Sequence, residues 1–152
     1  MRPTTRLLPI AAFLISAAWM TASGQSTTPA AVPEDHRTMV TRLYTGTDGQ
    51  SHFDETPLAL HGAGAEESAP QLMSDAYVVR GAPGFFETWH NADKKRYIVV
   101  VSGEAEVVTT GGEKATFVPG HIYLAEDLTG KGHTFRVVGN QEWVALFVNF
   151  AQ

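Results

Sequence analysis

The chain has 152 residues, of which 43% are hydrophobic and 18% charged, and this composition suits one globular domain rather than a disordered or fibrous chain. The net charge is -5 and the basic residues form no cluster, so a nucleic-acid partner is not expected. The sequence contains no cysteine, which excludes disulfides, thiolate metal ligands and a cysteine nucleophile.

Residues 1–24 have the pattern of a secretory signal peptide. Arg2 and Arg6 precede an apolar stretch over residues 7–20, and small residues follow it up to Gly24. The apolar stretch is shorter than the roughly 20 residues that a transmembrane helix needs, so cleavage after Gly24 is expected instead of a membrane anchor. We therefore expect the mature protein in the periplasm or outside the cell, with no membrane span after cleavage.

The remaining chain divides into a linker and one β domain. Residues 25–38 are rich in Ser, Thr, Pro and charge without apolar periodicity, which predicts a disordered linker. From residue 39 onward, short runs of Val, Tyr, Phe and Leu are separated by turn residues, which predicts an all-β domain over residues 39–152. Strands are expected at residues 40–44, 56–60, 76–80, 85–90, 96–101, 104–109, 114–118, 122–125, 134–138 and 142–150. Residues 110–113 (TGGE) predict a tight hairpin, and residues 61–70 a surface loop.

A motif over residues 84–103 resembles the first motif of the cupin superfamily. In that motif a Gly is followed by two His, a Glu and a second Gly at fixed spacings. Gly84, His90 and Gly103 fall on this frame without a gap. Two ligand positions are changed, because Ala92 stands where the second His belongs and Arg96 where the Glu belongs. The frame is thus kept while half of its metal ligands are replaced.

A looser match follows over residues 112–138, where His133 stands after a turn, as the last metal ligand of cupins does. The resemblance implies a cupin-type jelly-roll β-barrel, the fold of many metal-dependent oxygenases, isomerases and binding proteins. It further implies that His90 and His133 are candidate ligands of a divalent transition metal such as Fe, Mn, Ni or Zn. Paired barrels are common in this family, so a homodimer through sheet edges is an alternative to a monomer, with the apolar strand 142–150 as a candidate contact.

Alternation along the strands predicts which side chains face the barrel interior. If His90 faces inward, Phe86 and Thr88 face the same way, whereas Glu87 and Trp89 face outward. The predicted ligand-binding residues of the interior are Phe86, Thr88, His90, Arg96, His133 and Phe135. Two imidazoles in an apolar interior are unfavourable unless they bind each other, water, a metal or a ligand, so the sequence predicts a site between them.

Arg96 has two interpretations. Facing inward, its guanidinium suits the carboxylate or phosphate of a small organic anion. A shift of one residue in register would instead turn it outward to pair with Asp93 or Glu104.

A metal would need ligands from outside the cupin frame, since an inward Arg96 repels a cation. The candidates are His52, His121, Glu87, Glu126 and Asp127. Each has a structural alternative, because histidines often bond turns and acidic residues often cap backbone amides.

The sequence leaves three functions open. The first is an exported single-domain cupin that binds a small organic molecule in the barrel interior. The second is a metal-dependent oxygenase or isomerase that uses His90 and His133 with a non-standard ligand set. The third is a metal-free isomerase in which one imidazole acts as general base. No catalytic residue is assigned, and the sequence does not decide whether the protein is an enzyme.

Overall fold

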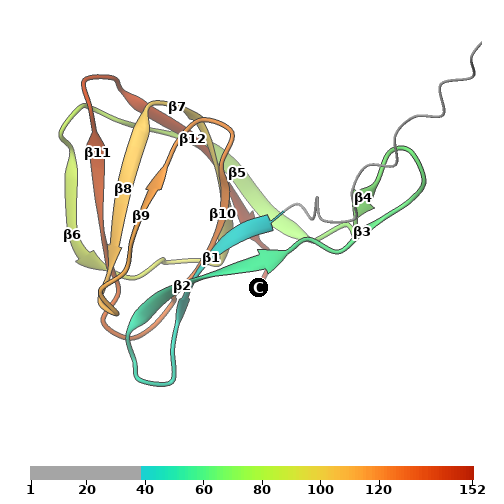
Figure 1. Cartoon of the computed structure of the whole chain (residues 1–152), viewed down its shortest axis with the longest axis horizontal. Helices are drawn as coiled ribbons and strands as arrows, with labels where there is room; N and C mark the ends of the chain where they lie inside the picture. Colours follow the sequence, from blue (N-terminus) through green and yellow to red (C-terminus); the bar gives the residue numbers. More distant parts are fainter. Residues whose placement is uncertain (1–38) are drawn as a thin grey trace, which may run out of the picture. The chain divides into compact units, whose positions relative to one another are not determined.

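The computed structural model describes residues 39–152, which form an all-β domain of two large sheets that face each other (Figure 1). The expected signal peptide and linker, residues 1–24 and 25–38, lie outside the described residues. Within residues 39–152, the structure has no helix that is long and apolar enough to cross a membrane.

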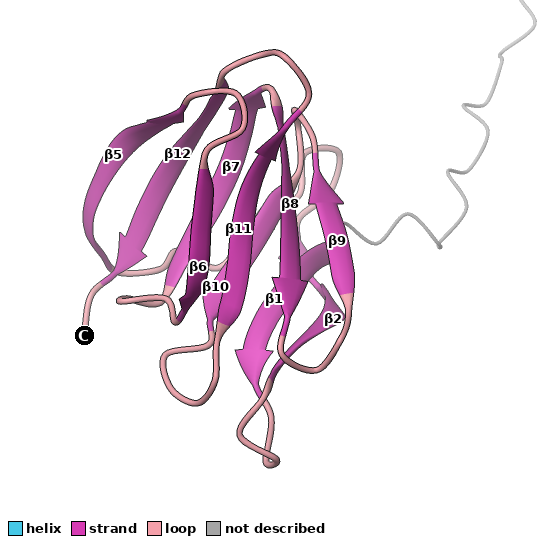
Figure 2. Cartoon of the chain, turned by 90° about the vertical axis from the view of Figure 1, so that its left-hand side faces the viewer, coloured by secondary structure: helices cyan, strands magenta, loops and turns pink. Residues whose placement is uncertain are grey.

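Twelve strands build the described part of the chain. They are β1 (Met39–Thr45), β2 (Ser51–Pro57), β3 (Leu60–His61), β4 (Glu67–Ser68), β5 (Met73–Gly81), β6 (Phe86–His90), β7 (Arg96–Ser102), β8 (Glu104–Thr109), β9 (Lys114–Phe117), β10 (Ile122–Glu126), β11 (His133–Val138) and β12 (Trp143–Phe150). One sheet has the order β2-β1-β10-β7-β12-β5 and the other the order β6-β11-β8-β9, which lies in front in Figure 2. A separate hairpin pairs β3 with β4. All pairs are antiparallel except β1 and β10.

Nine of the ten expected strands agree with the structure to within a few residues. The expected strand over residues 56–60 is wrong in its bounds, because β2 already begins at Ser51. The polar residues of β2 are held by cross-strand bonds that a hydrophobic pattern does not reveal, such as the ion pair between Asp54 and Arg42. The segment 61–70 is not entirely a loop, since it contributes to the short β3–β4 hairpin.

The hairpin expected at residues 110–113 is confirmed. It joins β8 to β9, and the amide of Thr109 donates a 2.9 Å hydrogen bond to the carbonyl of Glu113. Gly112 has a φ of +93° there, a conformation that glycine adopts without strain.

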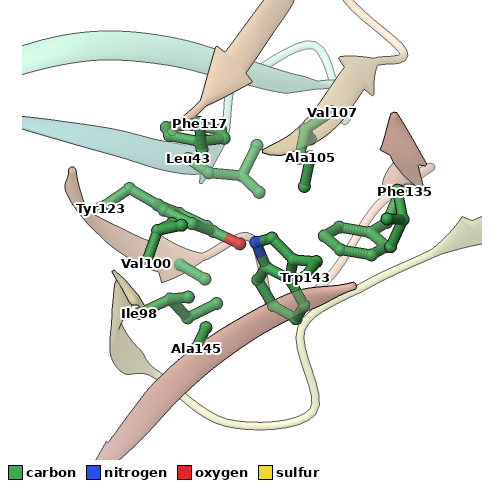
Figure 3. Packing of buried hydrophobic residues seen from close by; sticks show 12 residues of the cluster. Leu43, Ile98, Val100, Ala105, Val107, Phe117, Tyr123, Phe135, Trp143 and Ala145 are labelled. Carbon is green, nitrogen blue, oxygen red and sulfur yellow. The ribbon is translucent and has the colours of Figure 1, made fainter. Parts of the chain in front are cut away.

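The hydrophobic core lies between the two sheets (Figure 3). Alternate residues of β7, β8 and β10 point into it, as their alternating burial shows. No β ladder joins the two large sheets within residues 39–152, so the domain has the double-sheet form of a jelly roll rather than one hydrogen-bonded cylinder.

Candidate functional site

A cavity of about 430 Å³ lies between the two sheets. Its apolar walls include Ile98 from β7, Phe135 from β11, and Trp143 and Phe147 from β12. Both predicted histidines, His90 and His133, line it as well. A concave site with mostly apolar walls and a few polar groups is typical of a small-molecule pocket, and this volume lies in the range of such pockets.

His90 and His133 meet in this cavity. They are register partners on the neighbouring strands β6 and β11, and their ring centroids are 4.3 Å apart with an interplanar angle of 55°. Gly132 permits this approach, since a Cβ at that position would lie 2.1 Å from the backbone oxygen of His90. Although the two histidines lie 43 positions apart in the sequence, the sheet pairing brings them together as expected.

Each imidazole is held through its Nδ1 atom. Nδ1 of His133 lies 2.7 Å from Oδ2 of Asp127, and Nδ1 of His90 lies 2.7 Å from the backbone oxygen of Thr88. A carbonyl oxygen only accepts hydrogen bonds, so Nδ1 of His90 carries a proton. This arrangement leaves Nε2 of both rings as the nitrogen atoms available to a ligand, with Nε2 of His90 3.6 Å from the carboxylate of Glu87.

Asp127 is the main residue that the sequence interpretation placed wrongly. We expected a turn acid or a metal ligand, but its side chain is fully buried behind His133. Its Oδ2 atom also accepts a 2.7 Å hydrogen bond from Oγ of Ser51. Asn91 ties down the same loop by donating to the backbone oxygens of Asp127 and Thr129. Asp127 therefore orients the imidazole rather than capping a turn.

The expectation that Phe86 and Thr88 share the inward face of His90 is wrong. The pairing of β6 with β11 shifts in register, because His90 pairs with His133 whereas Glu87 pairs with Phe135. Three steps along β6 thus match two steps along β11, and such a bulge reverses the alternation of facing side chains. As a result Glu87 lines the cavity. Phe86 is 47% exposed and Thr88 is also exposed.

Arg96 points inward but is not available as an anion receptor. Its side chain is buried, forms an ion pair with Asp93 and donates a 3.0 Å hydrogen bond to the hydroxyl of Tyr77. Its guanidinium also lies 5.1 Å from the ring centroid of Phe147. Arg96 thus faces inward, as the first interpretation predicted, and pairs with Asp93, which the second interpretation predicted for an outward side chain. The pairing neutralises the charge of the guanidinium.

Two further polar groups lie in the cavity wall. The hydroxyl of Tyr123 and Nε1 of Trp143 point toward one another at the centre of the cluster in Figure 3, from β10 and β12. Burial raises the pKa of the Tyr123 phenol well above its usual range, so this group keeps its proton and can donate. Nε1 of Trp143 is buried and has no hydrogen-bond partner in the described part of the chain.

A signal for Tyr123 was present in the sequence. Within β10 the side chains of Tyr123 and Ala125 alternate with polar or half-buried neighbours, and Asp127 continues the same inward series. Ser51 gave no comparable signal, since it lies 76 positions away from its partner Asp127.

The residues around the two histidines do not complete a metal centre. Residues 39–152 contain no group of three or more His, Asp or Glu side chains placed to hold a metal ion. His52 is held by Asp48 and Glu113 instead, and Glu126 pairs with Arg42 and Lys95. Together with Ala92 and Arg96 at two ligand positions of the cupin motif, this donor set does not fit the metal site that the resemblance implies.

Comparison with known proteins gives a likeness of fold. No family model matches the sequence, and no curated protein matches it either. Among solved structures, the chain is similar to a sugar phosphate isomerase of the cupin superfamily from Silicibacter pomeroyi, with 20% identity and a TM-score of 0.42 over 51% of this chain and 50% of that one. The match therefore spans only half the length of that protein.

Two other solved structures have comparable scores. A cupin domain from Bordetella pertussis matches with 19% identity and a TM-score of 0.42, over 51% of this chain and 80% of that one. A DMSP lyase from Ruegeria pomeroyi matches with 20% identity and a TM-score of 0.44, over 62% of this chain and 47% of that one. The solved structures to which this chain is similar are mostly cupin-domain proteins.

Proposed function

We propose that this chain is an exported single-domain protein of the cupin jelly-roll type that binds a small organic molecule in the cavity between its sheets. The proposal rests on the convergence of His90 and His133, whose ring centroids are 4.3 Å apart in a cavity with apolar walls. The Nε2 atoms of both rings have no hydrogen-bond partner among the described residues, so a ligand that donates a hydroxyl group can pair with them. Export rests on the signal-peptide pattern of residues 1–24.

The charges around the cavity favour a neutral ligand. Two guanidinium groups, of Arg80 and Arg96, and two carboxylates, of Glu87 and Asp93, lie in its wall, so their formal charges cancel. The most buried of the four, Arg96, already pairs with Asp93. A bound carboxylate or phosphate would have to displace that ion pair, and two of the three guanidinium nitrogens already donate, to the backbone oxygen of Lys94 and to the hydroxyl of Tyr77. A small organic anion, which an inward Arg96 suggested from the sequence alone, is therefore disfavoured.

The hydrogen-bonding groups define the ligand further. Nε2 of His90 or His133 can accept a hydrogen bond from a hydroxyl group. Aromatic walls formed by Phe135 and Phe147 favour a flat ring. We therefore take a neutral aromatic molecule with a hydroxyl group as the ligand class, and the ketone 4-hydroxyacetophenone as its representative.

A metal-dependent oxygenase or isomerase is the second candidate. Metal-ligating histidines commonly donate their other ring N–H to a carboxylate or a backbone carbonyl, and Asp127 and Thr88 hold His133 and His90 in this way. Within residues 39–152, however, no group of three or more His, Asp or Glu side chains is placed to hold the metal.

Calorimetric titration with a matched pair of probes tests the first proposal. We expect 4-hydroxyacetophenone to bind the purified protein, and the anion 4-hydroxybenzoate, which has nearly the same size, to bind at least about tenfold more weakly. A His90→Ala, His133→Ala double variant should no longer bind the ketone, whereas a His121→Ala variant should bind it as the wild type does. Equal binding of the ketone to the double variant, or no binding to the wild type, would contradict the proposal.

Elemental analysis separates the two candidates. Near-stoichiometric Fe, Mn, Ni or Zn in the wild type that is absent from the folded double variant would favour the metal-dependent enzyme. Metal-free wild-type protein that binds the ketone would favour the binding function.

A further inference from the structure

The two site histidines present two hydrogen-bond acceptors to the cavity, and a single hydroxyl group can donate to only one of them. Nδ1 of His90 lies 2.7 Å from the backbone oxygen of Thr88, and Nδ1 of His133 lies 2.7 Å from the carboxylate of Asp127. A carbonyl and a carboxylate both accept hydrogen bonds, so in each neutral ring Nδ1 carries the proton and Nε2 the lone pair. The two acceptors are therefore the two Nε2 atoms.

The two acceptors lie close together. The ring centroids of His90 and His133 are 4.3 Å apart, and the pairing of β6 with β11 fixes the two backbones beside each other. Gly132 contributes to this closeness, because a Cβ there would lie 2.1 Å from the backbone oxygen of His90. One ligand can therefore reach both nitrogen atoms if its two donors are neighbours as well.

Glu87 adds another acceptor rather than a donor. Its carboxylate lies in the cavity wall, with Oε2 3.6 Å from Nε2 of His90. This distance is too long for a hydrogen bond, and neither atom brings a hydrogen to the other when the imidazole is neutral. The wall beside His90 thus favours a ligand that supplies several hydroxyl hydrogens.

We propose that the ligand of this cavity carries two hydroxyl groups on neighbouring carbon atoms of an aromatic ring, as a catechol does. One hydroxyl donates to Nε2 of His90 and the other to Nε2 of His133. This inference rests on the proposed function, because it specifies the ligand class of the same site.

Displacement of water makes the second hydroxyl important. A ligand that fills the cavity keeps water away from both Nε2 atoms, and it binds more weakly when it does not replace the hydrogen bonds that water makes there. A single hydroxyl replaces one of these bonds, whereas a neighbouring pair replaces both. The aromatic side chains of Phe135 and Phe147 suit the ring that carries the pair.

Calorimetric titration with three acetophenones tests the proposal. 3,4-Dihydroxyacetophenone should bind about tenfold more tightly than 4-hydroxyacetophenone, which is the gain from one further hydrogen bond at a largely enclosed site. 4-Hydroxy-3-methylacetophenone is the size-matched control, because its methyl group takes the place of the second hydroxyl without a hydrogen to donate, and it should show no gain. The titrations are carried out under nitrogen and with EDTA, since catechols oxidise in air and chelate metal ions.

Two variants locate the two hydrogen bonds. His90→Phe keeps a ring but removes one acceptor, so the gain of the dihydroxy compound should disappear while 4-hydroxyacetophenone still binds through His133. Glu87→Gln changes an exposed side chain and should leave the fold intact, as circular dichroism would verify. The introduced amide can donate to Nε2 of His90, so the gain should decrease here as well. Glu104→Gln is the control, because Glu104 is also exposed but lies outside the cavity wall, and its gain should equal that of the wild type.

The outcomes separate this inference from the proposed function. Equal affinity of the wild type for the dihydroxy and the monohydroxy compound would overturn the two-hydroxyl inference and leave the proposed function standing. No binding of any of the three compounds would overturn both. A gain that disappears in EDTA, or that persists in His90→Phe, would also overturn the inference, because a metal ion or another part of the cavity would then hold the second hydroxyl.

Discussion

Asp127 lies directly behind His133, with its Oδ2 atom 2.7 Å from Nδ1 of the imidazole and no exposed surface of its own. The same oxygen accepts a hydrogen bond from Ser51, which holds the carboxylate in place. A carboxylate in this position fixes both the orientation of the ring and the nitrogen atom that carries the proton. The buried pair therefore determines which atom of His133 a ligand meets.

The tautomers of the two site histidines follow from these contacts. In neutral His90 and His133 we expect the proton on Nδ1 and the lone pair on Nε2, because Thr88 and Asp127 provide acceptors at Nδ1. Nitrogen-15 NMR of the imidazole rings measures this directly. Asp127→Asn should move the proton of His133 to Nε2, since the amide can donate to Nδ1.

Asp48→Asn is the control for this measurement, because Asp48 contacts His52 and not the site histidines. Its spectrum should show the wild-type tautomers at His90 and His133. Observation of an Nε2-protonated His133 in the wild-type protein would show that Asp127 does not orient the ring as the structure indicates.

Much of this architecture was predictable from the sequence because its signals are local. Turn residues such as Gly112 predicted the hairpin at residues 110–113, and the alternation in strands such as β7 predicted the strands along the chain. The positions of His90 and His133 followed from the same alternation together with the cupin frame. Such patterns predict structure reliably because turn residues set the local backbone conformation and the alternation reflects which side chains are buried.

The parts that could not be predicted depend on contacts between distant segments. The bulge between β6 and β11 exists only in the pairing of two strands, so nothing in the sequence of β6 reveals that Phe86 faces solvent. The bond from Ser51 to Asp127 likewise joins β2 to the loop after β10. The pairing of Arg96 with Asp93 was foreseen only for an outward side chain, because burial and pairing together required the structure.

Gly103 should be among the glycines least tolerant of substitution. Its φ is +70°, and a Cβ there would lie 2.4 Å from the backbone oxygen of Glu142 and 2.7 Å from Cα of Trp143. Gly103→Val therefore combines an unfavourable backbone conformation with a clash against backbone atoms. We expect a decrease in the free energy of unfolding of about 3 kcal/mol or more, measured by urea denaturation.

Gly139→Val separates the two causes. Gly139 has a similar φ of +75°, but a Cβ there would meet no atom within 4 Å. In this control the free energy of unfolding should decrease only by the cost of the backbone conformation, about 1–2 kcal/mol. If the two variants lost the same amount of stability, the close approach of Gly103 to Glu142 would not matter as the structure indicates.

The pH dependence of stability should carry a contribution from His52. A hydrogen bond to Asp48, assisted by Glu113, raises the pKa of His52 above its usual 6.5. Because the folded-state pKa is above the unfolded value, this contribution is fully present below about pH 6.5 and is lost as the pH rises through the raised pKa. On the acid side, the bond from the Gln50 amide lowers the pKa of Asp48 to about 2, so the contribution declines again as Asp48 becomes protonated.

Comparison of the wild type with His52→Ala over a pH series measures this contribution. The difference in unfolding midpoint should be largest between about pH 4 and pH 6.5 and should shrink above that range. His121→Ala is the control, since His121 bonds no carboxylate within residues 39–152. A difference that grew toward alkaline pH would have the wrong sign and would refute the assignment.

We propose that His90 and His133 present one shared site to a ligand in the cavity. Titration with 4-hydroxyacetophenone, followed in the ¹H–¹³C NMR spectrum of the histidine rings, tests this proposal most directly. The resonances of His90 and His133 should shift together, with one dissociation constant, while those of His52 and His121 stay in place. Shifts confined to His52 or His121, or independent responses of His90 and His133, would contradict a common ligand site.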